Sequence, residues 1–199
     1  MSVLVTQEAP DFTAPAVMPD GSIQDNFKLS ALRGKHVVLF FYPLDFTFVC
    51  PTELIAFNRR LAEFKKRKTE VIAVSIDSQF SHFAWKETPV EKGGIGNVQY
   101  PIVADIKHTI TQAYGIEHPA GVALRASFLI DKNGIVQHQV VNNLPLGRNV
   151  DEMLRMVDAL QFHEKHGEVC PAGWQKGEKG MKATTDGVAD YLAEHSDEL

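Results

Sequence analysis

The sequence predicts an α/β fold in which a central mixed sheet is flanked by helices. Two continuous apolar runs, residues 37–42 and 71–76, have the composition of strands that are buried on both faces. The segment between them carries apolar residues at the spacing of one helical face: Leu54, Phe57, Leu61 and Phe64. A strand, a helix over residues 52–67 and a second strand form a βαβ unit, which builds parallel sheets.

The elements around this unit follow the same alternation. In the Pro- and Gly-punctuated N-terminal stretch, Asp20-Gly21 predicts a hairpin or a loop. Ser78 is a suitable N-cap for a helix that reaches about Val90, because Pro89 disfavours its continuation. A short strand and a short helix are expected next, at residues 102–104 and 106–114.

A hairpin and a helix are expected to complete the sheet. The turn residues 131–134 (Asp-Lys-Asn-Gly) separate two strands at residues 127–130 and 135–141. Asn149 is a good N-cap for a helix that runs to about Lys165. The sequence therefore predicts one α/β domain over residues 1–166.

Residues 167–199 are predicted to form a C-terminal arm. This stretch is rich in Gly and Lys, contains Cys170, and is too polar to form a core of its own. A short helix is expected over residues 187–195.

Composition excludes several classes of function. The formal net charge of −5 and the absence of a cluster of five Lys or Arg argue against a nucleic-acid surface. No window approaches the length of an apolar membrane span, and residues 1–8 lack the features of a secretory signal. A cytoplasmic protein is expected. The tail at residues 196–199 is similar to retrieval tails of the KDEL type, but we interpret the match as coincidence.

Neither a metal nor a cofactor is predicted. The two cysteines form no C-x-x-C pair, and no Cys/His spacing fits zinc. His163 and His166 lack a third ligand nearby, so a solvated helix end is favoured. The loop at residues 93–96 lacks the Lys-Ser/Thr of a phosphate loop. Trp85 is expected to lie in the core or to line a pocket, rather than to stack on a cofactor.

Cys50 is predicted to lie at or beside the N-cap of the helix over residues 52–67. Pro51 suits the first helical position, where a missing N–H costs nothing. The sulfur then lies near unpaired backbone N–H groups, which favour a thiolate. Because a helix N-terminus stabilises a charge by only about 0.3–1 kcal/mol, a fully ionised nucleophile needs another cation.

Arg125 is the best candidate for that cation. It directly precedes the strand expected over residues 126–130, stays charged, and offers several donors in one plane. Arg148 is the next candidate. Glu53, in the first turn of the helix, is placed to orient either guanidinium.

Two of the residues that precede Cys50 in the sequence, Thr47 and Pro43, are suited to a reactive pocket. Thr47 is close enough in a tight turn for its hydroxyl to bond the thiolate or a bound oxygen, and Pro43 offers an apolar wall. Local composition alone favours a plainer alternative. A lone cysteine flanked by Phe48 and Pro51 is more often a small buried hydrophobe.

The pattern of Pro43, Thr47 and Cys50 resembles the active-site signature of the peroxiredoxins. Residues 169–174 are similar to the resolving-cysteine segment of that family's typical two-cysteine class. Residues 124–131 are similar to the stretch with its active-site arginine, and residues 144–148 to the stretch with its second arginine. The resemblance covers nearly the whole chain, and it favours a reactive Cys50 over the buried-hydrophobe alternative.

The resemblance implies a thioredoxin-like fold and a reaction in two steps. Cys50 is the implied peroxidatic cysteine, and its thiolate attacks the O–O bond of hydrogen peroxide or an organic hydroperoxide. The sulfenic acid that forms then condenses with Cys170 of the partner subunit. By the same resemblance, the peroxide pocket contains Pro43, Thr47 and Arg125. Glu53 and Arg148 form the supporting shell around it.

The resemblance also implies partners. A thioredoxin or a dedicated disulfide reductase would restore both thiols, and a head-to-tail homodimer would build toward a decamer. Two alternatives use the same cysteines, an oligomeric holdase chaperone and a peroxide sensor. A cysteine hydrolase is disfavoured because it requires a His/Asn pair around Cys50, and Thr47 does not serve that chemistry.

Sensitivity to over-oxidation is expected to be intermediate. Gly93-Gly94-Ile95-Gly96 resembles the Gly-Gly-Leu-Gly loop of peroxide-sensitive peroxiredoxins, with Ile in place of Leu. Tyr191-Leu192 stands where those proteins carry Tyr-Phe on the terminal helix.

Overall fold

A mixed sheet forms the centre of the first of two units, Met1–Val150 and Asp151–Leu199. The structure is a computed structural model that describes residues 3–198, so the last residue of the tail at residues 196–199 lies outside the described chain. Within that part, the sheet has seven strands in the order β2-β1-β5-β4-β3-β8-β9. These strands are β1 Thr13–Val17, β2 Ile23–Lys28, β3 His36–Phe41, β4 Thr69–Ser75, β5 Ile102–Ala104, β8 Arg125–Ile130 and β9 Val136–Asn142.

The sheet is parallel at its centre and antiparallel toward both edges. β3 pairs with β4, and β4 with β5, in parallel, as the predicted βαβ unit requires. β1 pairs with β2 and β5, and β8 with β3 and β9, in antiparallel register. The predicted central mixed sheet is therefore confirmed. So is the N-terminal hairpin, whose turn contains Gly21 at a φ of 86°.

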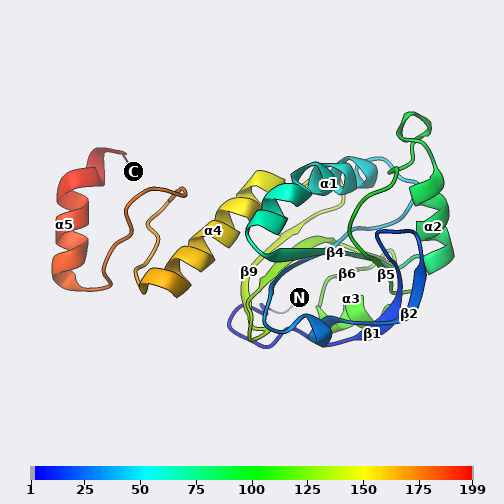
Figure 1. Cartoon of the computed structure of the whole chain (residues 1–199), viewed down its shortest axis with the longest axis horizontal. Coiled ribbons are helices and arrows are strands. Elements are labelled where there is room, and N and C mark those ends of the chain that lie inside the picture. Colours follow the sequence, from blue (N-terminus) through cyan, green and yellow to red (C-terminus); the bar gives the residue numbers. More distant parts are fainter. Residues whose placement is uncertain (1–2, 199) are drawn as a thin grey trace. The chain divides into compact units, whose positions relative to one another are not determined.

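Alternate side chains of β3 bury against two different layers. Phe40 stacks on Phe57 of α1, with ring centroids 4.1 Å apart. Phe41 packs against Tyr114, at the end of α3, at 5.1 Å. Because successive strand residues point to opposite faces, α1 and α3 lie on opposite sides of the sheet (Figure 1). This explains why every residue of β3 is buried.

The helices of the first unit are α1 Cys50–Lys66, α2 Gln79–Glu87 and α3 Thr109–Ala113, with 3₁₀ turns at Leu29–Leu32 and Val90–Lys92. Ser78 caps α2 as predicted, since its side chain accepts a hydrogen bond from the N–H of Ser81 at 3.2 Å. A short hairpin that the sequence did not indicate joins β6 Glu117–His118 to β7 Val122–Ala123.

The predicted helix over residues 106–114 begins too early, because α3 starts only at Thr109. The cause is the carboxylate of Asp105. It accepts hydrogen bonds from the N–H groups of Ile110 at 3.0 Å and Thr111 at 2.7 Å. These N–H groups therefore have a partner without an earlier helical turn to supply carbonyl acceptors. His108 precedes the helix in the left-handed region, with a φ of 59°.

The second unit contains α4 Val150–His166, α5 Thr185–His195 and a final 3₁₀ turn at Ser196–Glu198. α4 begins directly after Asn149, and α5 starts two residues earlier than expected. Between the helices, Val169 and Met181 exchange backbone hydrogen bonds of 2.9 Å in each direction. Trp174 is buried and packs on Phe162 at 4.8 Å, so the arm has a small apolar contact that its composition did not predict.

The two units divide at residues 150 and 151, within the first turn of α4. The sequence placed the end of the catalytic domain at residue 166, where α4 ends, and that functional boundary stays a prediction. No helix within residues 3–198 combines the length and the apolar composition needed to cross a bilayer.

Candidate active site

Cys50 is the first residue of α1 and follows the loop that leaves β3. It is only 1% exposed. Val49 is the N-cap, Pro51 lies in the first turn as predicted, and the N–H of Thr52 donates to the Val49 carbonyl at 3.1 Å. The thiol therefore lies at the positive end of a 17-residue helix.

Arg125, the first residue of β8, reaches the sulfur of Cys50. Its Nη1 lies 3.4 Å from Sγ, and its Nε donates to the carbonyl of Leu144 at 2.6 Å. The structure thus brings together the cysteine and the cation that the sequence paired. Both side chains are almost fully buried, so water screens the interaction weakly.

Glu53 joins the two candidate arginines. Its carboxylate accepts Nη1 of Arg125 at 2.7 Å and, from Arg148, the backbone N–H at 2.9 Å, Nε at 2.7 Å and Nη2 at 2.9 Å. Burial raises the pKa of Glu53, but the hydrogen bonds and charge of Arg148, helped by the charge of Arg125, outweigh it and lower the pKa below 4.5. The sequence suggested that Glu53 orients either guanidinium, and in the structure it holds both.

Arg148 anchors this group to the sheet. Its Nη1 donates to the carbonyl of Ala126 at 2.6 Å and to Oγ of Ser127 at 3.1 Å. Its guanidinium carbon lies 5.3 Å from the ring centroid of Phe40. These bonds place Arg148 on the Glu53 carboxylate, and the supporting role that the family resemblance implies stays a prediction.

Thr47 and Pro43 lie in the same loop as Cys50. The hydroxyl of Thr47 donates to the Leu44 carbonyl at 2.9 Å, so in this structure its hydrogen is directed to the backbone rather than to the sulfur. Its lone pairs remain as acceptors for a peroxide O–H. Pro43 is buried. The roles predicted for both residues stay predictions.

A buried polar network behind this loop was missed at the sequence level. His82, fully buried on α2, lies with its Nδ1 2.8 Å from Oδ2 of Asp45, and the hydroxyl of Tyr42 donates to Oδ1 of Asp45 at 2.7 Å. The N–H of Asp45 donates to Asp77 at 2.9 Å. Burial, followed by the charge of Asp45, raises the pKa of Asp77. No local pattern pairs residues 37 positions apart, and the only available signal was an aspartate between apolar residues in a predicted loop.

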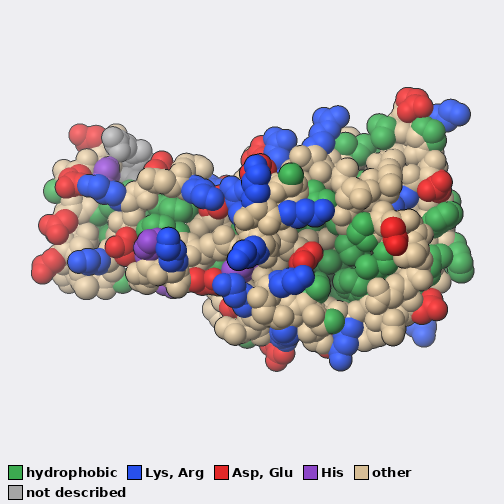
Figure 2. Space-filling view, viewed as in Figure 1, with side chains coloured by type: hydrophobic (Ala, Val, Ile, Leu, Met, Phe, Trp, Pro, Cys, Tyr) green, Lys and Arg blue, Asp and Glu red, His purple; other side chains and the backbone are tan. Residues whose placement is uncertain are grey.

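Exposed aromatic side chains occur on the same loop and on α2. Phe46 is held at a positive φ of 53° and packs on Trp85 at 5.7 Å. Phe48 is 92% exposed, and Phe80 and Phe83 of α2 are exposed as well. Figure 2 shows hydrophobic side chains gathered over α2. Trp85 itself is fully buried, which confirms its expected place in the core.

Cys170 lies in the second unit, between α4 and α5. It is half-buried, and its thiol donates to the carbonyl of Ala159 at 3.5 Å. Burial raises the pKa of Cys170, and the positive charge of Arg155 opposes that rise. Neither Cys170 nor Cys50 is part of a disulfide.

The two histidines and the Gly-rich loop have partners within their own units. His163 bonds the carbonyl of Glu168 at 2.8 Å and the His166 ring packs on Phe162, as suits a helix end. Among residues 3–198, no three His, Cys, Asp or Glu side chains gather as a metal site. Ile95 of the Gly-rich loop is buried, and the Trp85 indole N–H donates to the Gly93 carbonyl at 2.9 Å.

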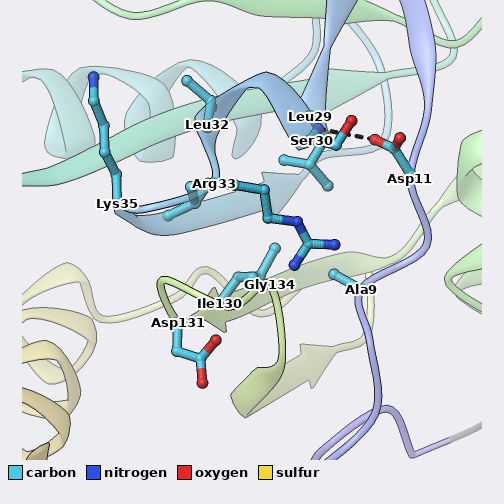
Figure 3. Close-up of a pocket in the computed structure, with 11 residues that line it drawn as sticks. Ala9, Asp11, Leu29, Ser30, Leu32, Arg33, Lys35, Ile130, Asp131 and Gly134 are labelled. Atoms are coloured by element: carbon cyan, nitrogen blue, oxygen red, sulfur yellow. Dashed lines mark hydrogen bonds between the residues drawn. The ribbon is translucent and has the colours of Figure 1, made fainter.

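A pocket on the first unit lies among Ala9, Leu29, Arg33, Ile130 and Gly134 (Figure 3). The Arg33 guanidinium points into it and pairs with Glu8 and the Asn133 carbonyl. A Cβ at position 134 would collide with Arg33. The pocket is therefore a packing site for an arginine, and it contains none of the predicted site residues.

Replacing Glu53 with glutamine is expected to destabilise the fold by about 3–5 kcal/mol, because two buried guanidinium groups would lose their counter-charge. Urea denaturation at pH 7 measures this effect. Glu63→Gln on the exposed side of α1, which breaks pairs with Lys66 and Arg67, is the matched control and should change stability little. Equal stability of Glu53→Gln and the wild type would contradict the predicted importance of the buried pair.

The ion pairs of Glu53 with Arg125 and Arg148 also predict how stability depends on pH. The pKa of Glu53 lies below its ordinary value of 4.5 in the folded chain, so its stabilising contribution is complete above that value. The contribution is lost as the pH falls through the lower, folded-state pKa. The difference in stability between wild type and Glu53→Gln should therefore shrink below pH 4.5.

Known proteins resemble the chain over almost its full length. Residues 5–139 match the model of the AhpC/TSA family, and residues 159–194 match the C-terminal domain of 1-Cys peroxiredoxin. Alkyl hydroperoxide reductase C of Helicobacter pylori strain J99 is 60% identical over 99% of this chain and 100% of its own length.

Solved structures agree with this result. The reduced 2-Cys peroxiredoxin of Plasmodium vivax superposes with a TM-score of 0.94 at 51% identity, covering 96% of this chain and 100% of the other. A Plasmodium yoelii Prx1a, described as modified at its N-terminus and forming an artifactual octamer, gives a TM-score of 0.77 at 53% identity, over 85% of this chain and 98% of that one. The predicted thioredoxin-like fold is confirmed by these neighbours. The chain belongs to the AhpC/TSA family and is a peroxiredoxin, a thiol-dependent peroxidase.

Proposed function

We propose that Cys50 is the residue that reduces hydroperoxides. The observation that carries this proposal is the contact of 3.4 Å between its sulfur and Nη1 of Arg125 at the start of α1. The thiolate attacks the terminal oxygen of R–O–O–H, the O–O bond breaks, and the alkoxide leaves and takes up a proton. Arg125 supplies donors for the charge that moves from sulfur to the leaving oxygen.

Thr47 and Pro43 complete the pocket in this proposal. The Thr47 hydroxyl lies in the loop just before Cys50, where its oxygen accepts the peroxide O–H. Pro43, buried and without an N–H, limits the access of water. Glu53 and Arg148 hold the Arg125 guanidinium in place and do not themselves react.

The second step forms a disulfide between chains. The sulfenic acid on Cys50 condenses with the thiol of Cys170 in a second copy of this chain, and water leaves. Cys170 is the only other cysteine. The description of the Plasmodium vivax relative as a 2-Cys peroxiredoxin supports a two-cysteine cycle. On this proposal residues 1–166 form the peroxidase domain and residues 167–199 deliver the resolving cysteine.

A dithiol protein then reduces the disulfide. Thioredoxin or a dedicated disulfide reductase has the required chemistry, and such a reductant operates in a reducing compartment, which we take to be the cytoplasm. Homodimers assemble further, toward a decamer. The aromatic side chains exposed on α2 and on the loop before Cys50 support this assembly, since a monomer rarely leaves such a group uncovered.

One equivalent of peroxide is expected to convert the wild-type chain to a covalent dimer on a non-reducing gel. The Cys170→Ser variant should remain monomeric on the same gel, because its sulfenic acid has no resolving thiol. Addition of dithiothreitol should return the wild-type dimer to the monomer. A wild-type chain that stays monomeric, or a Cys170→Ser chain that still dimerises, would count against a disulfide between Cys50 and Cys170 of the partner subunit.

A further inference from the structure

One face of α4 holds the segment that carries Cys170. Arg155, Ala159 and Phe162 lie on this face, spaced by four and three residues. Each contacts the segment that follows the helix. Arg155 donates to the Trp174 carbonyl at 3.0 Å, the Ala159 carbonyl accepts the Cys170 thiol, and Phe162 packs on the Trp174 ring. The thiol is therefore placed within one turn of the Arg155 position.

The guanidinium of Arg155 is fixed on its other side. Glu152, one turn earlier, accepts Nε at 2.7 Å through one oxygen and Nη2 at 2.7 Å through the other. A bidentate pair fixes the plane of a guanidinium and restricts its side-chain torsions. With Nε and Nη2 occupied by Glu152, Nη1 is the nitrogen that reaches the segment of residues 170–174.

The thiol itself is held in an unreactive form. In the structure it donates its hydrogen to the Ala159 carbonyl, a bond that only the protonated sulfur makes. Burial also favours the neutral thiol, whereas the charge of Arg155 favours the thiolate. Arg155 is thus the group near Cys170 that acts toward ionisation.

We propose that Arg155 is a positioning residue for disulfide formation, which holds the Cys170 segment on α4 and electrostatically promotes the thiolate that attacks the sulfenic acid. This inference rests on the proposed role of Cys170. In the step, the Cys170 thiolate forms the S–S bond at the Cys50 sulfur as the S–O bond breaks. Hydroxide leaves and combines with the thiol's proton as water. The Cys50 sulfur is reduced and the Cys170 sulfur is oxidised, so no further oxidant is required.

Other charged or titratable side chains around the segment have partners of their own. Asp158 of α4 lies 3.3 Å from Lys176, and Glu178 accepts the N–H of Gln175 at 2.6 Å. His163 bonds the carbonyl of Glu168, the residue at the start of the segment. None of these contacts involves Arg155, so they are present in each Arg155 variant.

The test measures Cys170 alone, in a Cys50→Ser background, by its rate of alkylation with iodoacetamide as a function of pH. Replacing Arg155 with methionine should slow alkylation at pH 7 by about threefold or more and should move the midpoint to higher pH. Arg155→Lys, which keeps the charge, should restore most of the rate. Lys176→Ala is the matched control, since it loosens the same segment by removing the ion pair of the exposed Lys176 with Asp158 without touching Arg155.

A purely structural clamp predicts the opposite result. Loss of Arg155 would then expose Cys170 and speed alkylation, the midpoint would stay in place, and Lys176→Ala would behave like Arg155→Met. Any of these three outcomes overturns the proposal. Circular dichroism of each variant shows whether the α-helices are intact, and the Lys variant keeps the test valid if methionine disturbs the fold.

A second measurement separates this inference from the proposed function. With Cys50 restored, stopped-flow mixing with peroxide should show an unchanged first oxidation and a disulfide step slowed by the same factor as alkylation. If alkylation slows but the disulfide step does not, the role proposed for Arg155 in disulfide formation is overturned. If the wild-type chain shows no disulfide step at all, it is the resolving role of Cys170 that fails.

Discussion

Replacing Cys50 with serine is expected to abolish peroxide consumption, with a loss of about 10⁴-fold or more. A serine hydroxyl remains protonated at neutral pH, and its oxygen does not provide the soft, polarisable nucleophile that attacks an O–O bond. Because Cys50 is buried and serine is close to it in size, the fold should survive. A coupled assay with dithiothreitol as reductant and hydrogen peroxide as substrate measures the loss.

Cys170→Ser is the matched control for this result. It removes the other thiol but leaves Cys50 and its arginine in place, so in the absence of dithiothreitol it should consume one equivalent of peroxide per chain and then stop. A Cys50→Ser protein that turned over peroxide would contradict the assignment, whereas activity lost equally in both variants from the first equivalent would show that neither cysteine acts alone.

The Cys50→Ser variant also separates peroxidase activity from chaperone activity. A holdase binds unfolded chains through exposed apolar surface, such as the aromatic side chains on α2, and needs no thiolate. Any suppression of aggregation that the wild type shows should therefore persist in Cys50→Ser. Loss of both activities together would point to a role for the thiol in assembly as well as in catalysis.

The central sheet could be predicted because its strands are buried on both faces. Such strands contain almost no polar residue, so the runs at residues 37–42 and 71–76 stand out without any knowledge of their partners. The start of α3 could not be predicted in the same way. It depends on Asp105, whose carboxylate replaces the first helical hydrogen bonds, and a local pattern does not show which side chain captures a free N–H.

The candidate site was only partly accessible to local reasoning. The position of Cys50 at a helix start follows from Pro51 and the helical periodicity after it. The reach of Arg125 does not, because it depends on the antiparallel pairing of β8 with β3. That register pairs Phe40 with Ser127 and so carries Arg125 to the end of β3, from which the Cys50 loop leaves. Family resemblance supplied this long-range information.

The network of Asp45 and His82 had no such signal. Its members come from a loop and from the buried face of α2, and each alone looks like an ordinary polar residue. Buried polar groups are paired, but the partner is chosen by the tertiary packing, which a single sequence does not display.

Replacing Arg125 with lysine is expected to slow the oxidation of Cys50 by peroxide by about 10²–10³-fold, the usual cost of losing a donor placed for the transition state. Lysine keeps the positive charge but offers donors from one nitrogen. Arg125 uses separate nitrogens for the Leu144 carbonyl and for the pair of Cys50 and Glu53, so one ammonium cannot replace its geometry.

Comparison of two reactions of the same thiol distinguishes ionisation from transition-state stabilisation. Alkylation by iodoacetamide needs the thiolate but no donor aligned with an O–O bond. In Arg125→Lys the retained charge should keep the alkylation rate within about tenfold of the wild type, because lysine still places a cation near the sulfur. The peroxide reaction, followed by stopped-flow tryptophan fluorescence, should fall much further.

Arg148→Lys is the control that isolates the role of Arg125. It disturbs the same carboxylate of Glu53, with bonds of 2.7 Å and 2.9 Å at stake, but does not contact the sulfur. It should therefore lower the free energy of unfolding, but it should slow the peroxide reaction less than Arg125→Lys does. If Arg125→Lys lowers alkylation and peroxide reduction by the same factor, Arg125 serves only to ionise Cys50. The proposed mechanism predicts the larger fall in the peroxide rate, because the Glu53 carboxylate holds the Arg125 guanidinium beside the Cys50 sulfur, at the place where the proposed reaction needs a donor.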